Sequence, residues 1–114
     1  MKPEHRMGTS LKDLRGFPDK VQDDIGYALY LAQLGEKHEA AKPLKGFAGA
    51  GVLEIVESHD GDAYRAVYTV KLARAVYVLH VFQKKSKRGI ATPKSEIELI
   101  KQRLKLAIDD DKDV

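Results

Sequence analysis

The chain has 114 residues, 43% of them hydrophobic, which is the length of one ordinary domain and enough apolar content for a single core. It contains no cysteine, so disulfides, thiolate zinc sites and cysteine nucleophiles are excluded, and a reducing cytoplasm is the expected compartment. The net charge is +3, and no segment resembles a signal peptide or reaches the length of a membrane span, so we expect one soluble domain over residues 1–114 with no membrane contact.

The N-terminal part predicts two helices after a short polar segment. Residues 1–8 are either a frayed terminus or a weak edge strand. Ser10 to Phe17 carries apolar residues at helical spacing and ends before Pro18, which cannot continue a helix. Asp19 to Leu34 predicts a longer and largely buried helix.

A long connection then leads into strands. Residues 36–51 contain one proline and three glycines without a sustained period, so they predict a loop, which Leu44 and Phe47 attach to the core. Alternating apolar and β-branched residues predict three strands: Val52–Ser58, Tyr64–Val70 and Ala75–Phe82. The pair Asp60-Gly61 suits a tight turn that needs positive φ, so the first two strands form a hairpin.

The C-terminal part predicts one more helix and a tail. Thr92 is a suitable N-cap with Pro93 after it, and apolar residues at spacings of three and four continue to Ile108. Residues 109–114 are mostly aspartate, and we expect a disordered acidic end.

This order of elements predicts an α+β domain. The three strands form an antiparallel meander, and we expect both N-terminal helices and the C-terminal helix to pack on one face of it. The other face of the sheet is then left free for function.

The most concentrated charge follows the last predicted strand. Four cations occur within five positions: Lys84, Lys85, Lys87 and Arg88. Such runs are usually solvated loops, yet a basic cluster beside a rigid sheet is also a way to hold a polyanion, so nucleic-acid contact is the functional interpretation of these residues.

Two strand residues are candidates for chemistry. His80 shares a strand face with Val78, Phe82 and Lys84 by alternation, and is either a partly buried sheet histidine or a catalytic group. Arg65 is either a paired sheet charge or a phosphate ligand. The histidines are scattered and no glycine-rich phosphate loop occurs, so we expect neither a metal nor a cofactor.

Two aromatic residues near these candidates also have either a functional or a structural role. Phe82 and Tyr64 offer stacking surfaces for an RNA base, whereas packing in the core is the commoner role of such residues.

Most of the chain resembles a known toxin family. The runs FPDKVQDDIGYALYLAQLG, PLKGF and GVLEIVESHDGDAYRAVYTV, together with FQKKSKRGIATP and the helix after it, are similar to the phage-derived, HigB-like branch of the RelE/ParE superfamily. The resemblance implies the toxin of a type II toxin–antitoxin pair, with a RelE/ParE-like fold, a helix-turn-helix antitoxin as partner, and cleavage of mRNA on the ribosome.

The resemblance also implies roles for individual residues. Arg65 corresponds to the strand arginine of the RelE-like nucleases, and Lys84 and Lys85 to the basic pair after the last strand. The first meander strand departs from the RelE branch, because Glu54 and Glu57 stand where that branch carries lysines. The superfamily also contains ParE-like gyrase inhibitors, so the alternative is a non-catalytic inhibitor or an inactive phage-derived binding domain.

A metal-free mechanism fits the nuclease hypothesis. RNA supplies its own 2′-hydroxyl nucleophile, so the protein needs to move two protons and stabilise charge on the phosphorane. Arg65 is suited to hold the non-bridging oxygens, and a lysine of the basic cluster, or else His80 or Glu54, to transfer protons.

Overall fold

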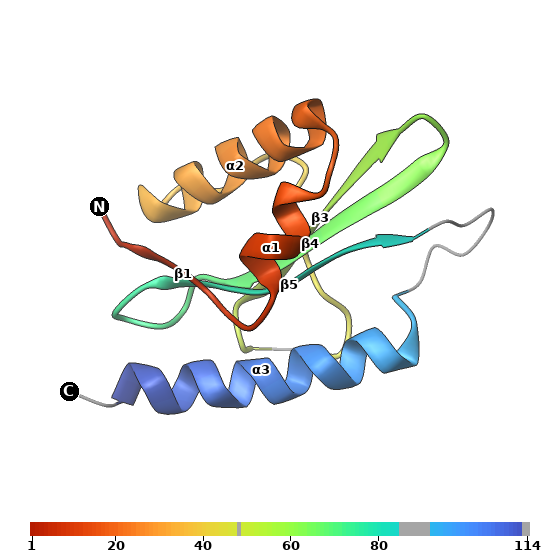
Figure 1. The fold of residues 1–114 in the computed structure, drawn as a ribbon. Coiled ribbons are helices and arrows are strands. Elements are labelled where there is room, and N and C mark those ends of the chain that lie inside the picture. The colour runs from red at the N-terminus through yellow and green to blue at the C-terminus, as the bar shows by residue number, and fades with distance from the viewer. Residues whose placement is uncertain (48, 85–91, 113–114) are drawn as a thin grey trace.

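The computed structural model describes residues 1–47, 49–84 and 92–112 of the chain. Within these ranges the fold is α+β, with a five-stranded mixed sheet and three helices. The elements follow the order β1 (Glu4–Arg6), α1 (Ser10–Arg15), α2 (Asp19–Gln33), β2 (Lys42–Pro43), β3 (Val52–His59), β4 (Asp62–Thr69), β5 (Val76–Lys84) and α3 (Lys94–Lys112) (Figure 1).

The sheet has the strand order β1-β5-β4-β3-β2. The predicted meander is confirmed, because β3 pairs antiparallel with β4 and β4 with β5. The predicted hairpin turn is confirmed as well, with Asp60 at a φ of 50° and Gly61 at 85°. Both angles lie in the left-handed region that a tight hairpin turn requires, and glycine reaches that region at little cost.

The polar N-terminal segment is an edge strand and not a frayed end. β1 runs parallel to β5, with Glu4 opposite Val76 and Arg6 opposite Val78. The strand has only three residues and carries charged side chains, which is how natural proteins protect a sheet edge from further pairing. The whole sheet is therefore mixed, although the meander within it is antiparallel.

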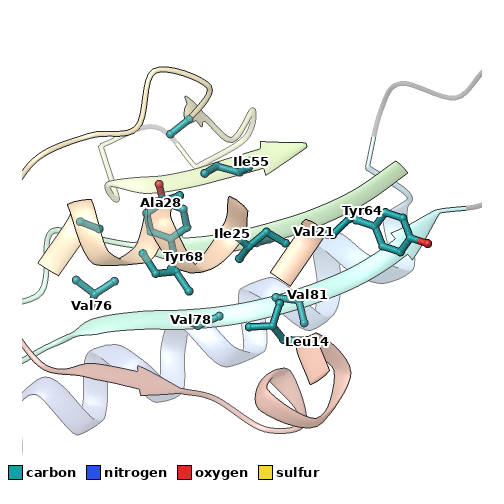
Figure 2. Packing of buried hydrophobic residues seen from close by; sticks show 14 residues of the cluster. Leu14, Val21, Ile25, Ala28, Ile55, Tyr64, Tyr68, Val76, Val78 and Val81 are labelled. Atoms are coloured by element: carbon teal, nitrogen blue, oxygen red, sulfur yellow. The ribbon is translucent and has the colours of Figure 1, made fainter. Parts of the chain in front are cut away.

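The sequence predicted that all three helices pack on one face of the sheet, and this prediction is wrong. Figure 1 shows α2 and α3 on opposite sides of the sheet. One core, drawn in Figure 2, joins α1 and α2 to strand residues such as Ile55, Tyr68 and Val78. A second core joins Ile100 of α3 to the other face. No face of the meander is left bare.

The reason is that the central strands are apolar on both faces. In β5 the side chains of Val76 and Val78 belong to the first core, whereas Tyr77 and Leu79 belong to the second. All four are at most 1% exposed. A sheet with two apolar faces has to be covered on both sides, and α3 covers the second one.

The connection between α2 and β3 packs as predicted. Leu44 and Phe47 are buried in the second core, together with Ile100 of α3. The connection also contains the two-residue strand β2, which pairs with β3 at the edge of the sheet. Its backbone is therefore fixed beside α3.

The prediction of a disordered acidic tail is wrong for residues 109–112, because α3 continues to Lys112. The Asp111 carboxylate accepts hydrogen bonds from the backbone N–H groups of Ala73 (3.2 Å) and Arg74 (2.7 Å) in the β4–β5 turn. Asp110 accepts a hydrogen bond from the Tyr77 hydroxyl at 2.7 Å. These carboxylates bind the end of α3 to the sheet instead of extending into solvent.

A pair of carboxylates lies between α2 and β3, where Glu57 faces Asp24. Burial raises the pKa of Glu57 above its ordinary value of 4.5, and the charge of Asp24 and a hydrogen bond to it raise it further. A raised carboxyl pKa means that ionisation is less favourable in the folded than in the unfolded chain. The native protein therefore loses stability as the pH rises from about 4.5 through the folded pKa of Glu57.

We expect Glu57→Gln to stabilise the protein at pH 7, by about 0.5 kcal/mol, since like-charged neighbours cost a few tenths of a kcal/mol. At pH 3.5 the Glu57 carboxyl is protonated in both the folded and the unfolded chain, so the two proteins should then be equally stable. Thermal unfolding of both proteins at the two pH values measures this, with the exposed Glu98→Gln as control. An equal stabilisation at both pH values would contradict the assignment.

In the part of the chain that the structure describes, no helix is long and apolar enough to cross a membrane.

Candidate functional site

Arg65 lies in the middle of the sheet, on the face that α3 covers. Its neighbours Tyr64 and Ala66 belong to the opposite core, as strand alternation predicted. The Arg65 guanidinium donates to a Glu54 carboxylate oxygen at 3.2 Å and lies 3.5 Å from the Thr92 hydroxyl. The residue is 4% exposed. Arg65 is therefore a buried cation held by a carboxylate from the neighbouring strand.

The Arg65–Glu54 pair fixes a charged donor at one end of α3. The Thr92 hydroxyl also lies 3.5 Å from the same Glu54 oxygen, so it contacts the ion pair from the segment that enters α3. A guanidinium has five N–H donors, and it stays charged at any pH the protein meets. Arg65 therefore places a permanent positive charge beside Glu54.

Phe82 and His80 lie on the same face as Arg65. Phe82 is directly opposite Arg65 in the β4–β5 ladder, and its ring stacks on the His80 ring with centroids 4.9 Å apart. Both side chains are less than 10% exposed, at 8% and 5%. Phe82 and His80 form an aromatic pair beside the guanidinium.

The expectation that Val78 shares this face is wrong because β5 contains a bulge. Val67 pairs with His80 and Tyr68 with Val78, so Leu79 is an extra residue in the ladder. An extra residue shifts the alternation of a strand by one position. Val78 therefore packs under α2, whereas His80 contacts α3.

Two residues of α3 lie against the His80 ring. Nδ1 of His80 lies 3.2 Å from Nη1 of Arg103, which also donates to the Leu79 carbonyl at 3.0 Å. A guanidinium only donates, so Nδ1 is the acceptor and the proton of the neutral ring is on Nε2. Nε2 lies 3.2 Å from a Glu96 carboxylate oxygen, at angles poor for a hydrogen bond.

Burial lowers the pKa of His80 below its ordinary value of 6.5, and the charge of Arg103 lowers it further, whereas the carboxylate of Glu96 raises it. The ring is accordingly neutral at pH 7. A neutral, stacked and nearly inaccessible imidazole fits the alternative of a buried sheet histidine rather than a catalytic group.

Of the other predicted site residues, Tyr64 is not brought together with Arg65. Tyr64 lies on the opposite face, where its ring packs against Phe17 at 4.9 Å. Lys84 is the last residue of β5. Three of the predicted basic residues lie outside the described residues: Lys85, Lys87 and Arg88.

A hollow of about 430 Å³ opens beside the ion pair. Glu54 and Thr92 line it on one side, and Lys42 and Lys45 contribute the only cationic side chains among its described lining residues. It has room for a phosphate group and part of a sugar. An anion in this hollow would meet two lysines near the Arg65 guanidinium.

Within the described ranges, no cluster of His, Asp or Glu could hold a metal ion.

The sequence predicted Arg65, Phe82 and His80 as site candidates but missed three of their partners. Glu96 and Arg103 are seven residues apart on α3, a spacing that places them on one helix flank, and this periodicity was the available signal. Thr92 was predicted only as a helix cap. Its contact with Glu54 spans 38 positions and has no local signature.

Comparison with known proteins gives one match. A search of the curated proteins and a search of the solved structures found no match to the chain. The model of the family described as phage-derived protein Gp49-like (DUF891) matches residues 12–105, which include every described residue of the candidate site. The chain therefore belongs to the phage-derived Gp49-like family, which is part of the toxin group of toxin–antitoxin systems.

Proposed function

We propose that this protein is the toxin of a type II toxin–antitoxin pair, of the HigB-like branch of the RelE/ParE superfamily, and that it cleaves mRNA on the ribosome. Its membership in a toxin family and the basic run after β5 support the proposal. The observation that carries it is the Arg65 guanidinium, held by Glu54 beside a lysine-lined hollow. A helix-turn-helix antitoxin is the proposed partner.

The proposed reaction uses the RNA as its own nucleophile. The 2′-oxygen attacks the adjacent phosphorus, the bond from phosphorus to the 5′-oxygen breaks, and the products are a 2′,3′-cyclic phosphate and a 5′-hydroxyl. Arg65 donates to the non-bridging oxygens, where negative charge increases in the transition state. Fixed donors of this kind need no reorganisation during the reaction.

Glu54 is the proposed acceptor of the 2′-hydroxyl proton. Its carboxylate contacts Arg65 and also lines the hollow, so it borders both the phosphate ligand and the space for the sugar. His80 is less suited to this role, because it is 5% exposed and its Nδ1 faces Arg103. Lys84 or Lys85 is the proposed donor of the proton that the leaving 5′-oxygen takes up.

One observation favours a non-catalytic toxin of the gyrase-inhibitor type or an inactive binding domain. Arg65 is buried in an ion pair, which is also the arrangement of a structural charge in a sheet. Glu54 at the position of a lysine in the RelE branch agrees with this alternative. The two functions differ in what happens to translated messages.

We expect induced expression of the chain to arrest growth and to produce discrete breaks in translated mRNAs, mapped by primer extension. A message with its start codon removed is the control, and it should stay intact because cleavage requires a translating ribosome. Co-expression of the adjacent open reading frame should restore growth if it encodes the antitoxin. Growth arrest with intact messages would contradict the nuclease and support the gyrase-type alternative.

A further inference from the structure

One flank of α3 carries a stripe of lysines. Their spacings along the helix are seven, four and seven residues, so at 3.6 residues per turn they lie within about 40° of one another around the axis. All are exposed: Lys94, Lys101, Lys105 and Lys112. At 1.5 Å per residue the stripe is about 27 Å long.

The connection between α2 and β3 runs beside this flank, and Figure 1 shows it in yellow reaching α3. Two hollows lie along the seam. The first, of about 430 Å³, is the one beside Glu54, with Lys42 and Lys45 on the connection and Ile97 on α3. The second, of about 370 Å³, lies further along α3, between Phe47 and Leu104, with Lys101 and Lys105 at its rim. Four lysines line the hollows, and Lys94 and Lys112 extend the stripe beyond them along α3. We call the two hollows and these six lysines the lysine furrow.

The furrow has a net positive charge and an apolar floor. Glu54 is neutralised by Arg65, and helical geometry places Glu98 and Asp109 just outside the lysine stripe. The six lysines of the furrow thus outnumber these two carboxylates. The floor consists of apolar side chains from the connection and from α3, among them Phe47, Leu104 and Ile108.

We propose that a single strand of RNA lies along the lysine furrow, with the phosphate to be cleaved at the Arg65 end. This inference rests on the proposed function, and it adds the path of the substrate. Lysines act as point charges that neutralise phosphates without reading sequence, and their repetition over about 27 Å matches a polyanion of uniform charge. The apolar floor offers contact to base faces.

RNA fits the furrow better than an acidic peptide for a geometric reason. The furrow ends at Glu54 and Thr92, which hold the proposed phosphate ligand Arg65. A strand bound along the six lysines would deliver a phosphate to that position. An acidic helix would use the lysines and the apolar floor but would not require the arginine at the end.

The test measures binding of a fluorescent 12-nucleotide RNA, made uncleavable by 2′-O-methylation, to the full chain by anisotropy at 50 and 200 mM salt. We expect the double variant Lys101→Glu/Lys105→Glu to bind at least tenfold more weakly at 50 mM salt. The slope of log K against log salt should become less negative by about 1.4 for this variant, since each of the two lost phosphate contacts with a single strand contributes about 0.7.

The matched control is Arg15→Glu/Lys37→Glu, which changes the net charge equally at exposed positions in α1 and after α2. It should bind within about threefold of the native chain, because long-range attraction alone is screened at these salt concentrations. An equal loss of RNA affinity in both variants would show that only the net charge matters, and it would overturn the proposal that RNA binds in the furrow. Unchanged RNA affinity in the furrow variant, with loss of binding to an acidic amphipathic peptide, would assign the furrow to a protein partner.

Mapping of message breaks separates the furrow from the nuclease proposal. If the native chain produces no breaks while the furrow variant still loses RNA affinity, the furrow stands and the nuclease fails. If the native chain cuts messages and the furrow variant cuts them equally well, the nuclease stands and the furrow fails.

Discussion

Arg65→Ala is expected to lower the rate of mRNA cleavage by about 10²–10³, which is the usual loss when one donor to a developing negative charge is removed. The guanidinium is already oriented by Glu54 at 3.2 Å, so its contribution needs no rearrangement of the side chain. Growth inhibition after induction and the yield of message breaks measure the effect. At least one of Lys84→Ala and Lys85→Ala should lose toxicity as well.

Stability has to be separated from chemistry in this experiment, because Arg65→Ala leaves a partly buried Glu54 without its ion-pair partner. Arg65→Lys is therefore the second variant. It keeps a cation beside Glu54, so the fold should be retained, but it lacks the planar fork and should still cleave poorly. Arg15→Ala, on α1, is the control for an exposed arginine. Full toxicity of Arg65→Ala, Lys84→Ala and Lys85→Ala would show that the site is assigned wrongly.

Ile100→Ala is expected to destabilise the protein by about 2–5 kcal/mol, the range for large-to-small changes in a packed core. Ile100 is 0% exposed and is the larger of the two fully buried α3 side chains in the second core, which also contains Leu44 and Phe47. For a domain of this size we expect the melting temperature to fall by about 10 °C or more. Thermal unfolding followed by circular dichroism measures this loss.

Leu106→Ala is the matched control, since Leu106 lies on the same helix and is 58% exposed. It should change the stability by less than about 0.5 kcal/mol. A similar effect of the two substitutions would mean that α3 is not docked on the sheet through Ile100. Because α3 begins next to Thr92, undocking should also release the contact of Thr92 with Glu54 and reduce cleavage.

Local patterns predicted most of the elements. The strands of the meander and the three helices were predicted within a few residues of their ends, because alternation, helical spacing and turn residues are properties of neighbouring positions. The same alternation correctly placed Arg65 and Tyr64 on opposite faces of β4. The register of a strand is fixed once one of its faces is buried.

Other features depend on contacts between distant positions. The bulge at Leu79, which turns His80 toward α3, leaves no mark in the apolar pattern of β5. The acidic end of α3 looked like a solvated tail because aspartates are usually exposed. It is ordered because Asp111 meets two backbone N–H groups 37 and 38 positions away.

The sequence by itself determined an α+β domain with an antiparallel meander, the identity of Arg65 as a candidate ligand, and the resemblance to a toxin family. Only the tertiary structure decided that α3 covers the second face of the sheet, since helical amphipathicity shows which flank is buried but not which surface buries it. That choice places Thr92 against the Glu54–Arg65 pair and brings Ile97 of α3 to the hollow that Lys42 and Lys45 line. The physical reason is that both faces of the sheet are apolar, so helices have to cover both of them.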